Sequence, residues 1–293
     1  MENVDLDKVK GTLKETQYPV NLVLETCAVC NLRCLMCPYK TMKRKNGYMS
    51  KELYEKIIKE IANSSPMDTA IWFAFMGEPL LHNGIFSRIA YAKKMGIEKT
   101  CLNTNATMVN DAVSEVLKDS GIDKVFVSVD AYDYRTYNKI KGVDFKFGHI
   151  EDKVESLVDA GIDVTVQFIV MDENRDEEQL FKDHWIKKGA KVKIRNKLGW
   201  GGKLSEDREI PERNMPCPWL MRQMIVLWDG RVAQCDGDYE GEHIKGNAND
   251  SSIYSIWNGE LAELRNKHCS GNYDFEPCKT CNDWSVGMAE IYE

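Results

Sequence analysis

Three cysteines near the start of the chain have a spacing that suits an iron–sulfur cluster. Cys30, Cys34 and Cys37 follow the apolar residues 20–24 in a C-x3-C-x2-C pattern. Thiolates are the usual ligands of [4Fe–4S] clusters, and a fully ligated cluster takes four of them. A cluster held by three cysteines therefore has one iron without a protein ligand, which a substrate can bind. Zinc sites follow the same rule, since three protein ligands are typical of catalytic sites and four of structural ones.

A zinc site is the alternative for the same cysteines. Cys27 and Cys30 form one C-x2-C pair, and Cys34 and Cys37 form a second, which is how zinc ribbons begin. The two pairs are only three residues apart, whereas zinc ribbons usually separate their pairs by a longer loop. The spacing favours the cluster. Cys27 is then a small buried residue or a bystander near it.

A second group of cysteines lies near the C-terminal end. Cys217 and Cys235 are spaced C-x12-G-x4-C around Gly230, and Cys278 and Cys281 form a C-x2-C pair, with Cys269 left over. Residues 226–232 predict a hairpin with an Asp-Gly turn that brings Cys217 near Cys235. Four thiolates would close a [4Fe–4S] cluster and favour electron transfer over substrate binding, although a structural zinc ion remains the alternative.

Composition places the chain among ordinary globular proteins. It has 293 residues, 43% hydrophobic and 29% charged, and a net charge of −7, which argues against nucleic acid as a partner. No apolar run approaches the ~20 residues of a membrane span, and the polar N-terminal segment is unlike a signal peptide. We expect a cytoplasmic protein without a membrane partner, whose ten cysteines serve metal or redox chemistry rather than disulfides.

Periodicity predicts a parallel α/β fold in which strands and helices alternate. The predicted strands are 20–25, 69–75, 99–103, 124–129, 163–170 and 191–194, and the predicted helices are 50–63, 85–95, 111–120, 146–160 and 177–188. Ser50 is the expected cap of the first helix. The alternation stops near residues 201–216, so we predict an N-terminal extension (1–19), an α/β domain (20–205) and a small cysteine-rich domain (206–293). The basic run 40–45 is expected to be a solvated loop or an anion-contacting lip.

Polar residues that follow the predicted strands match a known order of motifs. Gly77, Glu78 and Pro79 follow the second strand, Asn103 and Asn105 the third, and Ser128 and Asp130 the fourth, with Gln167 in the fifth. With C-x3-C-x2-C, this order resembles the radical S-adenosylmethionine (SAM) superfamily, although Met76, Ala106 and Met36 depart from its usual residues.

The resemblance implies a partial (β/α)6 barrel in which SAM binds the open iron and is cleaved to a 5′-deoxyadenosyl radical. The implied ligands of the SAM-binding [4Fe–4S] cluster are Cys30, Cys34 and Cys37. The implied SAM contacts are Met36, Gly77, Glu78, Pro79, Asn103, Asn105, Ser128, Asp130 and Gln167. An external electron donor such as flavodoxin or ferredoxin is expected.

The C-terminal cysteines resemble a SPASM/twitch extension with a single auxiliary [4Fe–4S] cluster held by Cys217, Cys235, Cys278 and Cys281. In size and cysteine plan the chain resembles the aminocyclitol (2-deoxy-scyllo-inosamine) dehydrogenase type. That resemblance implies oxidation of a secondary alcohol in a sugar, aminocyclitol or nucleotide-sugar, with the electron leaving through the auxiliary cluster. Asp236, Arg195 and Lys197 are candidates for the base or substrate clamp, and Asp236 is also interpretable as a surface turn residue.

Two other functions stay open. One is a radical SAM enzyme that modifies a ribosomally made peptide or carries out a redox-neutral epimerisation or deamination. The other is a zinc-stabilised binding protein without catalysis, which leaves the Gly77-Glu78-Pro79 segment and the Ser128/Asp130 pair unexplained.

Overall fold

One curved sheet organises the chain. The computed structural model describes residues 13, 15–144, 148–204 and 212–289. The sheet has eight strands in the order β6-β5-β4-β3-β2-β1-β7-β8, and every neighbouring pair is parallel except β7 and β8. The strands are β1 (Asn21–Leu24), β2 (Ala70–Phe73), β3 (Thr100–Thr104), β4 (Lys124–Ser128), β5 (Asp163–Val170), β6 (Lys191–Asn196), β7 (Gln223–Val226) and β8 (Val232–Ala233). The predicted parallel α/β class is confirmed.

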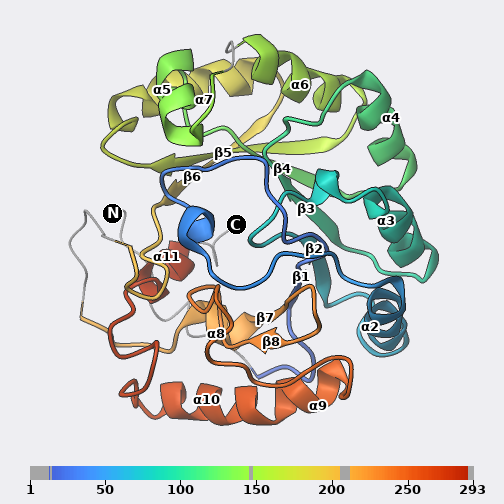
Figure 1. Cartoon of the computed structure of the whole chain (residues 1–293), viewed down its shortest axis with the longest axis vertical. Helices are drawn as coiled ribbons and strands as arrows, with labels where there is room; N and C mark the ends of the chain where they lie inside the picture. Colours follow the sequence, from blue (N-terminus) through green and yellow to red (C-terminus); the bar gives the residue numbers. More distant parts are fainter. Residues whose placement is uncertain (1–12, 14, 145–147, 205–211, 290–293) are drawn as a thin grey trace.

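Helices cover the convex side of this sheet. Figure 1 shows the sheet curving from β5 at the top, through β3 and β2, to β7 and β8 below, as an incomplete barrel. The barrel helices are α2 (Lys51–Ser64), α3 (Ile85–Lys94), α4 (Asp111–Asp119), α5 (Tyr134–Lys141), α6 (Gly148–Asp159) and α7 (Glu178–Lys187). Ser50 caps α2 as predicted, because its hydroxyl accepts a hydrogen bond from the Leu53 N–H at 3.1 Å.

Shorter elements complete the chain. The single-turn helices η1 (Pro38–Thr41), η2 (Pro79–Leu81) and η3 (Arg175–Glu177) lie in loops of the barrel. The C-terminal helices are α8 (Pro218–Arg222), α9 (Ile253–Asn258), α10 (Glu260–Cys269) and α11 (Trp284–Ala289). Within the described ranges, no helix combines the length and the apolar character that a bilayer span requires.

Alternating residues divide the sheet into two faces. Leu22, Ile71, Leu102, Val125 and Val166 belong to the main core together with the helix side chains. Their neighbours in sequence point to the other face, since side chains alternate along a strand. On that concave face the Trp72 and Phe126 rings lie 5.1 Å apart. Ser128 pairs with Gln167 in register, and Ile169 pairs with Arg195. The concave face therefore carries the polar residues that the sequence singled out.

The sheet continues from the predicted barrel into the predicted C-terminal domain. β7 pairs in parallel with β1, with Val23 opposite Ile225, so β1 is an interior strand. The hairpin formed by β7 and β8 was predicted, but its pairing with β1 was not. The proposed boundary at 205/206 lies at the edge of the described residues and stays a prediction.

Candidate active site

The N-terminal thiols lie on the loop that leaves the C-terminal end of β1. The Cys30 N–H donates to the Tyr39 hydroxyl at 3.0 Å, and the Cys37 N–H donates to the Cys34 carbonyl at 3.2 Å. The loop is also joined to α5, because the Leu35 N–H donates to the Ile140 carbonyl at 2.8 Å. These contacts fold the loop back on itself, so the C-x3-C-x2-C segment has a defined shape.

The three thiols influence one another electrostatically. The pKa of the Cys37 thiol is raised to about 12, mainly by burial and also by the nearby Cys34 and Cys30. Burial also raises the pKa of Cys34, against the opposing effect of the Lys141 ammonium. Such thiols stay protonated at neutral pH unless a positively charged centre binds them as thiolates. None of the cysteines is in a disulfide. The donor set therefore fits an iron–sulfur cluster.

Gly77 brings the Gly77-Glu78-Pro79 turn against the thiol loop. A Cβ at this position would lie 1.9 Å from the carbonyl oxygen of Cys27, so only glycine allows this approach. The Glu78 N–H donates to the Val29 carbonyl at 2.8 Å. Just before the turn, Phe75 has a φ of 113°, a strained conformation of the kind that concentrates at functional sites. The turn is thus packed against the backbone of Cys27 and Val29, just before Cys30 in the chain.

The Glu78 carboxylate accepts hydrogen bonds from other residues of the protein. Its side chain is buried and accepts hydrogen bonds from the Thr104 hydroxyl at 2.7 Å, the Asn105 N–H at 2.7 Å and the Leu80 N–H at 3.1 Å. Burial raises the pKa of this carboxyl, and the hydrogen bonds from Asn105 and Thr104 lower it. Glu78 therefore ties the turn after β2 to the end of β3. The structure shows this supporting role, and the predicted SAM contacts of Gly77, Glu78 and Pro79 stay predictions.

Glu78→Gln is expected to weaken SAM binding about tenfold, the effect of losing ~1.4 kcal/mol. In the variant, the NH2 group of glutamine would face the Thr104 hydroxyl or the Asn105 N–H, both of which now donate to a carboxylate oxygen. Two donors cannot pair, so the segment 103–105 would be displaced. Calorimetric titration of SAM into anaerobically reconstituted protein measures the change. The exposed Glu98→Gln is the matched control. Unchanged affinity in Glu78→Gln would remove this support role.

The predicted SAM contacts on the concave face include an unsatisfied acceptor. The side-chain oxygen of Asn103 is buried and has no hydrogen-bond partner among the described residues. A buried polar atom without a partner is costly, and a bound ligand can supply the partner. Ser128 and buried Gln167 are neighbours on the same face. Met36 packs with Ile140 and Met171 beside Cys34. These positions fit a ligand next to the thiol loop.

Asp130 supports the site through contacts within the protein. Its carboxylate pairs with the Lys141 ammonium at 2.6 Å, and its other oxygen accepts from the Ile169 N–H at 2.7 Å. Both charged side chains are fully buried. The pair joins β4, β5 and α5 behind the thiol loop. Asp130 therefore holds these elements in place, and its predicted SAM contact stays a prediction.

The C-terminal thiols form a second group, in which Cys217 and Cys278 are buried and Cys235 and Cys281 are half-buried. Burial raises the pKa of Cys235 well above its usual value, and the nearby Cys281, Cys278 and Cys217 thiols raise it further. Cys217 and Cys235 thus lie close enough to the C-x2-C pair to affect one another electrostatically, and their ligation of one cluster stays a prediction. Arg213 donates to the carbonyls of Cys278 at 3.3 Å and Cys281 at 3.1 Å. Four cysteines are the usual ligand set of a [4Fe–4S] cluster, so this group fits an auxiliary cluster.

The three candidate catalytic residues come from two different parts of the sheet. Arg195 is on β6 and Lys197 follows it, whereas Asp236 follows β8 at the other edge. The Asp236 carboxylate accepts from the Gln223 side chain at 2.6 Å. All three make further interactions within the protein. Asp236 is therefore a held carboxylate next to Cys235 rather than a solvated turn residue.

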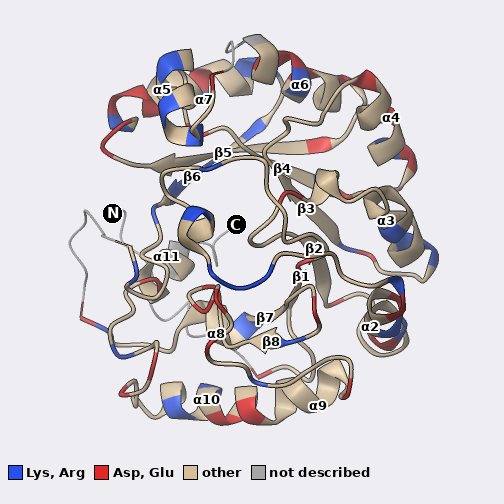
Figure 2. Cartoon of the chain, viewed as in Figure 1, with Lys and Arg blue, Asp and Glu red and all other residues tan. Residues whose placement is uncertain are grey.

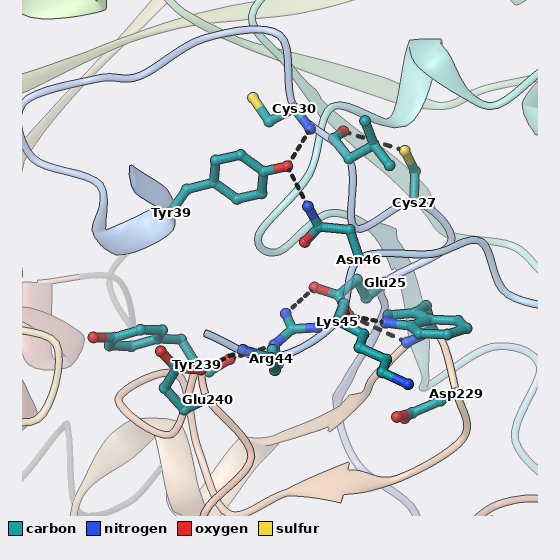
Figure 3. A network of polar contacts seen from close by, with 12 residues as sticks. Glu25, Cys27, Cys30, Tyr39, Arg44, Lys45, Asn46, Asp229, Tyr239 and Glu240 are labelled. Carbon is teal, nitrogen blue, oxygen red and sulfur yellow. Dashed lines mark hydrogen bonds and ion pairs between the residues drawn. The ribbon is translucent and has the colours of Figure 1, made fainter. Parts of the chain in front are cut away.

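A contact network that the sequence did not predict joins the loop after Cys37 to the loop after Cys235. Figure 3 shows Arg44 between Glu25, at the end of β1, and Tyr239 and Glu240, in the loop after Cys235. Arg44 pairs with the fully buried Glu25 and donates to the Tyr239 carbonyl at 2.6 Å, and its own N–H donates to Glu240 at 3.0 Å. Arg44 belongs to the basic run 40–45, whose lysines are exposed. In Figure 2 this run is the blue loop that crosses the centre of the view.

Trp200 provides a second link between the same loops. Its indole N–H donates to the Met36 carbonyl at 2.9 Å, and its ring lies edge-on to Tyr239 with centroids 6.0 Å apart. Asp283 accepts from the N–H groups of Gly199 and Gly201, at 2.6 and 2.8 Å, and so fixes the turn that carries Trp200. These contacts join residues far apart in the chain, so no local sequence pattern predicts them.

An incomplete parallel barrel with three thiols after its first strand, and four more in a C-terminal extension, defines a class of iron–sulfur barrel enzymes. Comparison with known families is consistent with this class. Residues 24–183 match the radical SAM superfamily, and residues 217–282 match the SPASM iron–sulfur cluster-binding domain. The chain belongs to the radical SAM superfamily, whose members use SAM and [4Fe–4S] clusters, and carries a SPASM domain.

Several known proteins are similar to this chain in sequence or in fold. The probable GTP 3′,8-cyclase of Saccharolobus islandicus is 30% identical over 153 residues, which are 51% of this chain and 47% of that protein. The chain therefore matches about half the length of these curated relatives. BtrN in complex with AdoMet and 2-DOIA has a TM-score of 0.67 and 21% identity, covering 94% of this chain and 96% of BtrN. Streptococcus suis SuiB bound to precursor peptide SuiA has a TM-score of 0.73 and 14% identity, covering 98% and 76%. At these identities the two structures show a shared fold.

Proposed function

We propose that this protein is a radical SAM dehydrogenase that oxidises a secondary alcohol of a small molecule, a sugar, aminocyclitol or nucleotide-sugar. The observation that carries the proposal is the presence of two separate cysteine groups, one of three and one of four, joined by one sheet. A set of three leaves an iron open for SAM, and a set of four is suited to electron transfer. The near full-length likeness to BtrN supports the same reaction type.

The residues that would hold the cofactors follow from the site. Cys30, Cys34 and Cys37 would bind the SAM cluster, and Cys217, Cys235, Cys278 and Cys281 the auxiliary cluster. The residues that would line the SAM site are Met36, Gly77, Glu78, Pro79, Asn103, Asn105, Ser128, Asp130 and Gln167. Glu78 and Asp130 also hold neighbouring elements in place. When bound, these groups supply a 5′-deoxyadenosyl radical that removes hydrogen from carbon, and an acceptor for the remaining electron.

Asp236 is the proposed base, and Arg195 and Lys197 are the proposed substrate clamp. The Gln223 amide holds one oxygen of Asp236, which leaves the carboxylate oriented to accept a proton from a substrate hydroxyl. Arg195 shares the concave face with Gln167, since its register partner Ile169 is two residues further along β5. A guanidinium and an ammonium at this edge suit hydroxyl, carboxylate or phosphate oxygens. They would orient the substrate carbon towards the SAM site.

The first test combines metal content with SAM cleavage. Anaerobically reconstituted protein is expected to contain about eight irons per chain, and about four when Cys30, Cys34 and Cys37 are all alanine. The triple variant should release no 5′-deoxyadenosine from SAM under a strong reductant, while Cys269→Ala, the matched single-thiol control, should behave as the wild type. Four irons together with zinc would remove the electron acceptor and with it the dehydrogenase. Zinc alone would refute the whole proposal.

A redox-neutral rearrangement is the second candidate. The curated relatives with the name probable GTP 3′,8-cyclase favour it, because they are 30% identical to this chain over 153 residues. The two candidates differ in the product formed from nucleotide-sugars, aminocyclitols or nucleoside triphosphates offered with SAM. A product that lacks two hydrogen atoms supports the dehydrogenase, and an isomer of the substrate supports the rearrangement. Asp236→Asn should abolish the oxidation and leave SAM cleavage intact.

A further inference from the structure

His268 lies buried between two of the C-terminal cysteines. It is on α10, and its side chain is 1% exposed. Its Nδ1 lies 3.2 Å from the backbone nitrogen of Cys217, which donates to it. Its Nε2 lies 3.3 Å from the sulfur of Cys278. The imidazole therefore contacts both ends of the cysteine group, one through the backbone and one through the sulfur.

These two contacts determine which ring nitrogen carries the hydrogen. A neutral imidazole has one donor nitrogen and one acceptor nitrogen. Because Nδ1 accepts the Cys217 N–H, Nε2 must carry the hydrogen and donate it towards the Cys278 sulfur. A histidine bound to iron through Nε2 would need its hydrogen on Nδ1, where it would meet the Cys217 N–H. The geometry is therefore that of a hydrogen-bond donor to the thiolate and not that of a metal ligand.

Neighbouring side chains hold the ring in this orientation. Tyr273 lies edge-on to the imidazole with centroids 5.1 Å apart, and Phe275 packs against it at 5.6 Å. The Gln234 amide adds a weaker contact to the same sulfur, at 3.6 Å. Cys278 thus receives two N–H donors.

We propose that His268 is a positioning residue that raises the reduction potential of the auxiliary cluster by donating its Nε2 hydrogen to the Cys278 thiolate. The inference rests on the proposed function, in that Cys278 must be a cluster ligand. On accepting one electron from the substrate-derived radical, the cluster and its thiolates become more negative by one charge. Hydrogen bonds to the sulfurs stabilise that state more than the oxidised one, and so raise the potential.

Two substitutions at His268 separate the donor from the acceptor. Asparagine has a polar atom where histidine has Nδ1, so His268→Asn can still accept from Cys217 but cannot reach the sulfur. Glutamine has an amide near the position of Nε2, so His268→Gln can still donate to the sulfur but gives up the Cys217 contact. A residue that only fills space would not distinguish these variants. Both are compared in the full-length chain with Cys30, Cys34 and Cys37 replaced by alanine, which leaves one cluster to observe.

The readout is a redox titration followed by electron paramagnetic resonance of the reduced cluster. At a fixed potential, His268→Asn should lower the ratio of reduced to oxidised cluster about tenfold, which is ~59 mV for one electron. His268→Gln should stay close to the parent. Equal potentials in the parent and both variants, with iron retained, would overturn the role of His268 and leave the proposed function standing. Absence of a cluster in the parent itself would overturn both.

A measurement on the unmodified chain tests the same hydrogen bond if His268→Asn does not retain the cluster. With 15N-labelled histidine, pulsed paramagnetic resonance should show a weak nitrogen coupling to the reduced auxiliary cluster, transmitted through the hydrogen bond. That coupling should disappear in His268→Gln, which has no imidazole. The strong coupling of a direct ligand, or no histidine coupling at all, would overturn the proposal.

Discussion

Gly77→Ala is expected to abolish SAM cleavage, with activity at least about a hundredfold below the wild type (more than ~2.7 kcal/mol). The added methyl group would lie 1.9 Å from the Cys27 carbonyl oxygen and 2.7 Å from its carbonyl carbon. Both are backbone atoms, so no side chain can rotate to make room. The loop that carries Cys30 or the turn that carries Glu78 must move instead, and they are joined by the hydrogen bond from Glu78 to Val29.

The measurement is iron content and 5′-deoxyadenosine release after anaerobic reconstitution. Gly96→Ala is the matched control, because a Cβ there meets no atom within 4 Å although its φ is +94°. It should cost only the strain of a positive φ, about 1–2 kcal/mol, without changing iron or activity. A Gly77→Ala protein that retains full iron and full SAM cleavage would show that the close approach is not needed.

Arg44→Met is expected to destabilise the protein by about 3–5 kcal/mol, because it leaves the fully buried Glu25 without its partner. It also removes the hydrogen bond to the Tyr239 carbonyl, which joins the N-terminal thiol loop to the loop after Cys235. Anaerobic urea denaturation followed by circular dichroism measures the loss. In the variant, burial raises the pKa of Glu25 without opposition from Arg44. The contribution of Glu25 to the stability of the variant is then fully present below the pKa of this group in the unfolded state, and it is lost as pH rises through the pKa in the folded state. The destabilisation by Arg44→Met should therefore be smaller in acid.

Two further variants make this prediction specific. Lys203→Met removes an ion pair with Glu242 whose side chains are 36% and 58% exposed, and it should cost less than ~1 kcal/mol. Adding Glu25→Gln to Arg44→Met should recover part of the loss, since glutamine removes the buried charge and can still accept from the Trp228 N–H. If Arg44→Met and Lys203→Met cost the same, the buried pair is not important for stability.

The barrel was predictable because its signals are local. Apolar alternation located all six of its strands, and Ser50 and the periodic residues of α2 located that helix to within one residue at each end. Helix α5 was missed, since Tyr134–Lys141 is polar and carries only a short apolar face. The pairing of β7 with β1 joins residues about two hundred positions apart. No local pattern records such a pairing, which depends on which strand edge is left uncovered.

The candidate site was predictable where chemistry requires a residue type. Thiols and glycines have few other uses at such spacing, so their types and order alone indicate the two cluster sites. Carboxylates are less informative, because Glu78 and Asp130 meet internal donors that only the fold places beside them. Arg44 could not be told from its neighbours in a basic run. His268 could not be distinguished from an ordinary helix residue, since its partners are separated from it in sequence.

The pairing of β1 with β7 has a consequence for the order in which the chain is made. Until Gln223–Val226 has been synthesised, one edge of β1 has no partner, and an open strand edge is a template for pairing with other chains. A fragment that ends before β7 is therefore expected to aggregate even though it contains every predicted SAM contact. The nascent polypeptide would need protection during this interval, and insertion of the first cluster would follow completion of the C-terminal hairpin.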